Sequence, residues 1–569
     1  MRSPIATVPT SISRPASGPP PEAAGLSTQA ADRRDRTRSP KGSAWRKDMV
    51  DPHIVGRGRT QKGAPIWDTP PAPFAISAIA ETRTFDVVIV GAGCAGIFAA
   101  HSAAEQGLKV ALIEKLPSLS ARGMDNGAVN TKLHKEAGIT IDEDMLLTDL
   151  VRFSTNRVHP ELVGIWVHES GRVFDHYIDL CRANDMQVAL VDCFSVAKTY
   201  PDMFRQYPTA HIFAGKGQKI STGNEYIPTQ EGFLTFVEGE AKKLGAEFHY
   251  NTACERILRE DGGRVTGIVA KDKDGRYVKF AAARAVVLAA GGYTENQEMV
   301  DAWCPVANDP EIRTFSPQGG NSGEVFAQAL WVGAGLQNWP HPVMIHTIPG
   351  FHIDLMAGNQ SFMHVNRLGK RFQSESLPNQ NLVNGRFRQP GRQAWAVFDA
   401  KYEKDHATFE TGFDGPITEP IDQLNFHADK GRLCRADTLE ELAQQMGVPA
   451  DTFVATCKRY SEMARNGKDE DFNKESYLMF TIEQAPFYAV PIRSHILVTV
   501  GGLDCDPDMQ VLDVDGNKID GLYAVGNMQG NFFANEYPLM APGLSHGRAI
   551  TLSYVLGERL AQAAVAART

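Results

Sequence analysis

Three glycines in one short turn give this sequence its clearest chemical signal. Their spacing is GxGxxG, in which the first glycine permits a tight bend, the second lets backbone approach a pyrophosphate, and the third lets a helix pack closely on a strand. A helix that begins at such a turn directs its N–H groups and partial positive charge towards the phosphates. An acidic side chain at the end of the next strand is placed to accept hydrogen bonds from ribose hydroxyls. The pattern therefore predicts a dinucleotide site made by Gly91, Gly93, Ala95, Gly96, Glu114 and Lys115.

The elements needed to position this turn flank it on both sides. Residues 84–90 (TFDVVIV) have the pattern of a short β-strand, residues 97–106 (IFAAHSAAEQ) that of a helix, and residues 109–114 (KVALIE) that of a second strand. Together they predict the strand–turn–helix–strand unit of a Rossmann-like domain.

Two later segments bear on which dinucleotide is bound. Ala290, Gly291 and Gly292 end an apolar strand, and Gly526 and Asn527 end the segment DGLYAVGN near the C-terminus. Both segments would let backbone pass close to a cofactor, and a nicotinamide domain would not need the distant C-terminal pair. We therefore expect a resident FAD, with an NAD-binding Rossmann protein as the alternative.

These motifs strongly resemble the fumarate reductase/succinate dehydrogenase flavoprotein superfamily, which includes urocanate reductases and 3-ketosteroid dehydrogenases, over residues 84–565. The resemblance implies an α/β fold: a Rossmann-like, glutathione-reductase-type FAD-binding domain with an inserted α+β cap domain, and substrate held between the two. It predicts that residues 71–344 and 485–569 form the FAD-binding domain and residues 345–484 the cap. The Pro-, Ser- and Arg-rich residues 1–70 are expected to be a disordered or extended tail.

The fumarate-reductase branch grips dicarboxylates with residues that this sequence lacks. Asn379 stands where the resemblance places a proton-donating arginine, Leu497 and Val498 replace a histidine signature, and no arginine precedes Gly543 in NEYPLMAPG. Apolar replacements cannot supply the charge-assisted hydrogen bonds that a buried dianion needs. Fumarate and succinate are therefore disfavoured as substrates.

The 3-ketosteroid dehydrogenase branch fits better, because RFQSESLPNQNLV, AWAVFDAKY and NEYPLMAPGLSHG are similar to its cap and C-terminal segments. This resemblance implies that the Tyr537 hydroxyl and the Gly543 amide polarise a substrate carbonyl. Asn379 also falls on a second, cap-borne tyrosine of that branch, and His346 lies close in alignment to a substrate-binding histidine of the fumarate branch. The candidate catalytic residues are therefore Tyr537, Gly543, His346 and Asn379.

The expected activity is that of an FAD-dependent oxidoreductase acting on a CH–CH or C=C bond next to a carbonyl. A hydride would move between flavin N5 and the carbon β to the carbonyl, and a proton would move at the α carbon. Ene reduction and α,β-desaturation are one mechanism in two directions, so the direction stays open. We expect an apolar enone-like or 3-ketosteroid-like substrate; the alternatives are a fumarate/urocanate-type reductase of an unsaturated carboxylate and a non-catalytic flavin electron-transfer subunit.

Composition excludes several other classes. The 569 residues are 43% hydrophobic with a net charge of −9, which is ordinary for a globular protein and opposite in sign to a nucleic-acid-binding surface. No apolar run approaches the ~20 residues of a membrane span. The eight cysteines form no CxxC and no Cys/His pair at metal spacing, so we expect no metal site and a reducing, cytoplasmic location. The expected partners are a small-molecule substrate and an unidentified electron donor or acceptor.

Overall fold

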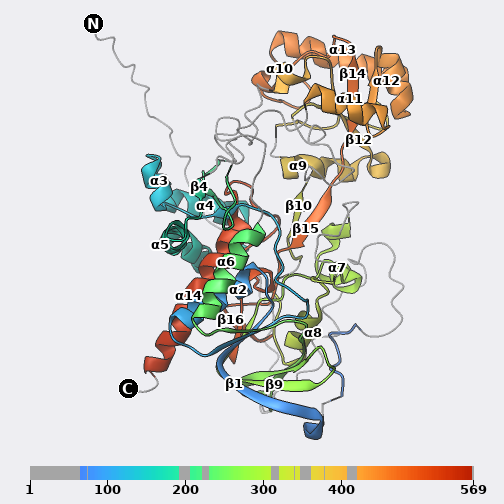
Figure 1. Ribbon diagram of the computed structural model, residues 1–569. Coiled ribbons are helices and arrows are strands. Elements are labelled where there is room, and N and C mark those ends of the chain that lie inside the picture. Colours follow the sequence, from blue (N-terminus) through green and yellow to red (C-terminus); the bar gives the residue numbers. More distant parts are fainter. Residues whose placement is uncertain are drawn as a thin grey trace, which may run out of the picture. The chain divides into compact units, whose positions relative to one another are not determined.

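The computed structural model describes residues 65–72, 75–190, 205–220, 230–308, 319–338, 340–346, 361–376, 379–406 and 420–566 (Figure 1). Nearly all of the predicted tail, residues 1–70, lies outside these described residues. Where the description begins, the segment around Trp67 packs on the protein, because the Trp67 ring lies 4.7 Å from that of Trp303 and the carbonyl of Ile66 accepts a hydrogen bond from Trp331.

A largely parallel sheet with the order β16-β17-β9-β1-β2-β6 forms the base of the fold. Its central strand β1 (Ile79–Val90) runs parallel to β2 (Val110–Ile113) on one side and to β9 (Tyr277–Leu288) on the other. β17 (Lys518–Ala524) pairs in parallel with β9, so the C-terminal part of the chain returns to this sheet. The remaining strands of this sheet are β6 (Glu247–His249), β7 (Ala253–Arg259), β8 (Val265–Lys271) and β16 (Gln510–Leu512).

The carboxyl ends of these parallel strands meet at one edge of the sheet. Val90 pairs in register with both Ile113 and Leu288, and Leu288 pairs with Ala524. The predicted glycine turn, Glu114 and both later glycine segments begin one or two residues after these four residues. In open α/β sheets, ligands bind at this edge.

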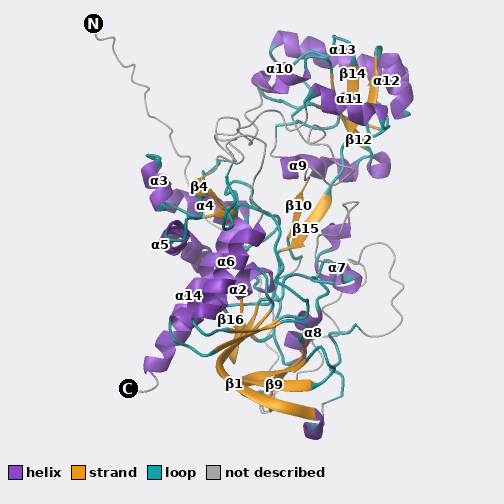
Figure 2. Cartoon of the chain, in the orientation of Figure 1, coloured by secondary structure: helices purple, strands orange, loops and turns teal. Residues whose placement is uncertain are grey.

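Three helices lie side by side next to the sheet: α2 (Cys94–Glu105), α6 (Gln230–Lys243) and α14 (Leu544–Ala566) (Figure 2). Every residue of α2 from Ala95 to Ala104 is buried, which its many small side chains permit. A Cβ on Gly557 of α14 would lie 2.4 Å from Ser102, so the two helices approach closely at that glycine. The neighbouring elements are β3 (Asn126–Gly127), α3 (Lys132–Glu136), α4 (Glu143–Phe153), α5 (Pro160–Arg182), β4 (Val188–Leu190), β5 (Ala210–Phe213), α7 (Gln297–Trp303) and α8 (Glu324–Trp331).

An α+β insertion follows β10 (Val343–His346) and precedes β15 (His495–Thr499), which pair with each other antiparallel. The insertion contains an antiparallel sheet with the order β11-β12-β14-β13. Its elements are β11 (Met363–Asn366), α9 (Asn379–Asn384), β12 (Ala394–Phe398), α10 (Tyr402–His406), α11 (Ile421–Asp429), β13 (Cys434–Ala436), α12 (Leu439–Met446), α13 (Ala450–Asn466) and β14 (Phe487–Pro491). The predicted fold class is confirmed. The cap boundaries at 345 and 484 stay a prediction, and the cap sheet itself extends to Pro491.

A buried ion cluster holds the cap together. The Arg371 guanidinium donates to Asp469 at 2.7 and 2.8 Å and to Glu375 at 2.8 Å, and the fully buried Lys474 ammonium lies 3.3 Å from Glu375. The cluster joins the segment after β11 to the segment after α13. Its charges balance, two cations against two carboxylates, which is the condition for burying them.

Replacing Asp469 by Asn should lower the free energy of unfolding at pH 7 by about 3 kcal/mol, because it leaves a buried cation uncompensated. Burial acts to raise the pKa of Asp469, but hydrogen bonds from Arg371 and the Lys474 backbone lower it to about 2. Since the folded pKa is depressed, the stabilisation is present above the ordinary pKa of 3.8 and is lost as the pH falls towards 2. The difference between wild type and variant in urea unfolding should therefore shrink between pH 4 and 2. Asp471→Asn, which only breaks an exposed pair with Arg459, is the control; equal losses in both variants would contradict this account.

Candidate active site

A cavity of about 780 Å³ lies at the carboxyl edge of the parallel strands. Its lining comes from the glycine turn, the ends of β2 and β9, the start of α6, β10, β15 and the loop that leads into α14. Of the predicted cofactor-binding residues, all line the cavity except Gly96, which packs beneath the turn: Gly91, Gly93, Ala95, Glu114, Lys115, Ala290, Gly291, Gly292, Gly526 and Asn527.

The glycine turn leaves room for a ligand on one side only. Gly91 has φ +111°, and a Cβ on it would lie 2.5 Å from the carbonyl oxygen of Ala289. A Cβ on Gly96 would lie 1.9 Å from the carbonyl oxygen of Gly91, so both positions require glycine for packing. A Cβ on Gly93 would instead meet no protein atom closer than 3.9 Å, which leaves space beside the backbone. Within the described part of the chain no side chain caps the N-terminus of α2 at Gly93, so the N–H groups of its first turn are available to an anion.

Glu114 and Lys115 lie beside this turn, and both charged side chains are bonded to other groups of the protein. The Glu114 carboxylate, 7% exposed, accepts hydrogen bonds from the backbone N–H of Ala92 at 2.7 Å and of Leu116 at 2.8 Å. Each carboxylate oxygen retains a second acceptor site for a ribose hydroxyl. Lys115 pairs with Glu324 and donates to the Ser322 hydroxyl at 2.6 Å.

Glu114→Ala should weaken FAD binding by about 1–3 kcal/mol, or about five- to 150-fold in Kd, because a charged acceptor is lost. Reconstitution of deflavinated protein with FAD, followed by flavin fluorescence, measures this change. Glu247→Ala, at a strand end outside the cavity where Glu247 pairs with Arg83, should bind FAD like the wild type. An unchanged Kd in Glu114→Ala would remove Glu114 from the cofactor site.

The later glycines bring backbone close to the same cavity. Gly291 has φ +79°, and the Asn321 side chain accepts a hydrogen bond from the Gly292 N–H at 3.1 Å. Gly526 has φ +62°, and a Cβ there would lie 2.7 Å from the Cβ of Ala95 in α2. The C-terminal return therefore contacts the first helix, as a site built from both chain segments requires.

Tyr537 and Gly543 line the cavity in the loop before α14. Tyr537 is 4% exposed, and its hydroxyl oxygen accepts the backbone N–H of Ser545 at 2.9 Å. This contact leaves the phenolic proton free to be donated into the cavity. Burial raises the pKa of Tyr537 well above its ordinary value, so the phenol keeps its proton at neutral pH. Among the described residues, no acceptor is bonded to the Gly543 N–H.

The loop that carries Tyr537 is tied to the cap. The Glu536 carboxylate accepts hydrogen bonds from Asn381 at 2.9 Å and from Asn384 at 2.5 Å, both on α9. Asn379 is the first residue of this helix, and His346 is the last residue of β10, opposite His495. The side chains of Asn379 and His346 lie outside the described part of the structure, so their predicted roles stay predictions.

Two functional candidates in this region were missed by the sequence analysis. His546 lines the cavity, and its Nδ1 lies 2.8 Å from the carbonyl oxygen of Asp125. Because a carbonyl only accepts, Nδ1 carries the proton and Nε2 of the neutral ring is an acceptor. Burial, together with the positive charge of Arg122, holds the pKa of His546 below its usual range.

Arg122 is the second missed residue. It lines the cavity, donates to the Leu497 carbonyl at 3.0 Å and forms no ion pair with any described carboxylate. Burial lowers its pKa to about 10, so it remains charged at neutral pH. The adjoining cavity wall is apolar, with Met344 and Val498 paired across β10 and β15 and Leu497 beside them.

Arg548 packs beside the cavity and contacts one of its lining residues. It is fully buried, lies 4.8 Å from the ring centre of Phe533, and donates to the Asn527 side chain at 2.9 Å. Burial lowers the pKa of Arg548 to about 10. It therefore fixes Asn527, one of the predicted cofactor-binding residues, in place.

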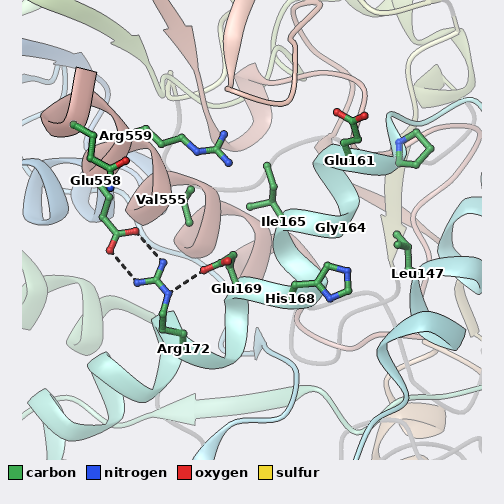
Figure 3. Close-up of a pocket in the computed structure, with 12 residues that line it drawn as sticks. Leu147, Glu161, Gly164, Ile165, His168, Glu169, Arg172, Val555, Glu558 and Arg559 are labelled. Carbon is green, nitrogen blue, oxygen red and sulfur yellow. Dashed lines mark hydrogen bonds and ion pairs between the residues drawn. The ribbon is translucent and has the colours of Figure 1, made fainter. Parts of the chain in front are cut away.

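A second hollow, of about 610 Å³, lies between α5 and α14 (Figure 3). Its central charged residues satisfy one another, since Arg172 is bonded to Glu558 at 2.9 Å through each of two nitrogens and to Glu169 at 2.9 Å. These side chains are half-exposed, and none belongs to the predicted site. We therefore assign the chemistry to the first cavity.

The residues of the first cavity fit an FAD. A free helix N-terminus and the open space beside Gly93 suit a pyrophosphate, Glu114 suits a ribose, and Gly526 and Asn527 close the site from the C-terminal side. None of the described helices is both long and apolar enough to cross a bilayer.

Comparison with known proteins agrees with this assignment. The chain is 26% identical to a vinyl phenol reductase of Lactiplantibacillus plantarum, over 85% of this chain and 98% of that protein, and 26% identical to a 3-oxosteroid 1-dehydrogenase of Mycolicibacterium smegmatis, over 85% and 99%. Its fold is similar to that of a 3-ketosteroid Δ4-(5α)-dehydrogenase from Rhodococcus jostii, with a TM-score of 0.67 at 22% identity, over 86% of this chain and 99% of that one.

The predicted cofactor, FAD, and the predicted enzyme class, a flavin oxidoreductase, are confirmed by the family match. Residues 86–544 match the family model described as an FAD binding domain. This match covers most of the chain, and the cavity has backbone groups and donors that suit the cofactor. The chain therefore belongs to the FAD-binding domain family.

Proposed function

We propose that this enzyme interconverts a saturated and an α,β-unsaturated carbonyl compound, with an uncharged, enone-like molecule as the preferred substrate. The relatives named above include a reductase of vinyl phenol and a dehydrogenase of 3-oxosteroids, and fumarate reductases of Shewanella frigidimarina are similar at 26–27% identity. This range of relatives supports the expectation of chemistry at a CH–CH or C=C bond. When bound, FAD supplies the hydride donor or acceptor.

The observation that carries the proposal is the hydrogen bonding of Tyr537. Its oxygen accepts an N–H from the first turn of α14, so its proton is free for a substrate oxygen in the cavity. Hydride addition at the β carbon builds negative charge on the carbonyl oxygen, and a fixed donor there lowers the barrier. The Gly543 N–H in the same loop is the second donor that we assign to this oxygen.

His546 is the group that we assign to the proton at the α carbon. Its neutral ring presents Nε2 as a base, while Nδ1 is held by the Asp125 carbonyl. With a pKa below the usual range, the ring is mainly unprotonated at neutral pH, which suits proton removal in the desaturation direction.

The apolar wall favours an uncharged substrate over a dicarboxylate. Met344, Leu497 and Val498 offer no hydrogen-bond donors from their side chains, and a buried dianion needs several. One observation favours the second candidate, a reductase of an unsaturated monocarboxylate: Arg122 lines the cavity with no ion-paired carboxylate among the described residues. A single carboxylate could be met by this one guanidinium.

Anaerobically reduced holoenzyme, mixed in turn with cyclohexenone, a 3-ketosteroid enone, cinnamate, urocanate and fumarate, tests the proposal through the rate of flavin reoxidation. We expect an enone to react at least tenfold faster than fumarate. Arg122→Gln should leave enone rates close to wild type and remove any reaction with cinnamate or urocanate. Fumarate reacting as fast as the best enone would overturn the proposal.

We also propose a cytoplasmic enzyme that exchanges electrons with a separate donor or acceptor. All seven cysteines in the described residues are free, which fits a reducing compartment. Relatives include enzymes named fumarate reductase (cytochrome), which supports a protein electron partner without identifying it.

A further inference from the structure

A group of potential metal ligands lies outside the cavity, where α2 meets α5. His101 and Glu105 are one turn apart on α2, and His176 lies on α5. One ligand atom of each residue lies within 4.8 Å of the other two. The closest pair is His176 Nε2 and Glu105 Oε1, which are 3.3 Å apart, and the two imidazole rings are 6.1 Å apart.

We propose that His101, Glu105 and His176 bind one divalent transition-metal ion, with Zn²⁺ as the best match. Two imidazole nitrogens and one carboxylate oxygen are a ligand set that Zn²⁺ uses in three-ligand sites with an open fourth position. Tetrahedral bonds of about 2.0–2.1 Å place the donor atoms roughly 3.4 Å apart. The Glu105–His176 distance already meets this value, and all three ligand atoms lie within 4.8 Å of one another before any ion is bound.

The surrounding hydrogen bonds orient the donors for this role. The Tyr177 hydroxyl lies 3.0 Å from His101 Nδ1, which leaves Nε2 for the metal. The Tyr554 hydroxyl of α14 donates to Glu105 Oε2 at 2.9 Å, which leaves Oε1. Such outer contacts, which fix the ring and carboxylate orientation, are the usual support of metal ligands.

The missing hydrogen bond of His176 Nε2 is not explained by its ion pair with Glu105 alone. This atom is shielded from solvent and makes no hydrogen bond among the described residues, although the ring as a whole is one-third exposed. Glu105 Oε1 lies 3.3 Å from it without the geometry of a hydrogen bond, and a buried imidazole nitrogen that makes no hydrogen bond is costly. A metal ion bound to it would remove that cost, and Glu105, which reaches the surface, gives the ion access from solvent.

The proposed metal would join α2 to α5 directly and α14 through the Tyr554 hydrogen bond, without taking part in the redox chemistry. None of the three ligands lines the cavity. However, α2 begins at the glycine turn, and α14 contributes both Tyr554 and the first-turn residues of the active site. Metal binding should therefore stabilise the helix layer and slow the loss of FAD.

Titration of tag-free, metal-stripped holoenzyme with Zn²⁺, by calorimetry and by competition with a chromogenic chelator, tests the proposal. We expect one Zn²⁺ per chain and a rise in melting temperature. Glu105→Gln and His176→Gln should each weaken binding at least tenfold and abolish the melting shift. His168→Gln is the matched control, because His168 lies on the same helix, pairs with Glu143 at 2.9 Å and belongs to no group of potential metal ligands among the described residues.

A milder variant keeps the test valid if a ligand variant fails to fold. Tyr554→Phe removes only the outer bond to Glu105 and should weaken Zn²⁺ binding about tenfold. Zinc-edge X-ray absorption of the wild-type complex should show two imidazoles in the first shell. Absence of stoichiometric binding, or binding unchanged in both His176→Gln and Tyr554→Phe, would overturn the proposal.

Discussion

Tyr537→Phe should lower turnover by about two to three orders of magnitude with its best enone or ketone substrate, while FAD content stays unchanged. The substitution keeps the ring, which packs 5.2 Å from Phe533, and deletes only the hydroxyl. Removing one donor from an oxyanion site typically costs about 10²–10³ in rate. The donor here is preorganised, since Ser545 fixes its oxygen and Glu536 ties the loop to α9. Steady-state turnover of the fully flavinylated variant measures the effect.

Tyr207→Phe is the matched control for this prediction. Tyr207 is also buried, and its backbone N–H donates to Met540 in the same loop, but its hydroxyl donates to Asp149 and it does not line the cavity. Its turnover should stay close to that of the wild type. If Tyr537→Phe also turned over normally, Tyr537 would be a packing residue, and the proposed polarisation of the carbonyl would be wrong.

The nucleotide-binding half of the fold could be predicted because its signals are local. The GxGxxG spacing, the β-branched run before it and the acidic residue after the next strand are all read within one short stretch. Even there β1 begins at Ile79, not at Thr84, because its first residues pair with the long strand β9. A polar, exposed strand start of this kind has no apolar pattern to reveal it.

The segment at the start of α14, which lines the active-site cavity, could be predicted only in part, because its residues have the composition of a loop. The apolar pattern of the last helix is continuous only from Ile550, whereas α14 begins at Leu544. The intervening residues, SHGR, are polar and contain a glycine, a pattern typical of a turn. Their polar groups are not facing solvent: His546 lines the cavity and Arg548 is fully buried. His546 was therefore missed as a candidate site residue.

The buried ion cluster of the cap could be predicted only in part from the sequence. Arg371 has Glu375 as a local partner four residues along the chain, but reaches Asp469, 98 residues along the chain, only through the fold. It forms the buried cluster with Glu375 and Asp469. The proposed metal ligands escaped the sequence analysis for a geometric reason, because His176 reaches α2 only through the packing of two helices.

His546→Asn should lower turnover by about 10²–10⁴, the range for loss of a positioned general acid or base. Asparagine retains a side-chain N–H near the position of Nδ1, so the bond to the Asp125 carbonyl can survive while Nε2 is removed. A merely structural histidine would therefore tolerate this substitution. FAD content should match that of the wild type.

The pH profile distinguishes a proton carrier from a residue that shapes the cavity. The pKa of His546 is lowered by burial and by Arg122, so in the desaturation direction the wild-type rate should hold at neutral pH and fall only below the ordinary imidazole value of 6.5, as the base becomes protonated. In His546→Asn this acid limb should disappear, because no group remains to titrate there. Arg122→Gln removes the nearby positive charge and should move the limb to higher pH. A wild-type limb that persists unchanged in His546→Asn would assign the proton transfer to another group, since the limb must follow the residue that carries the proton.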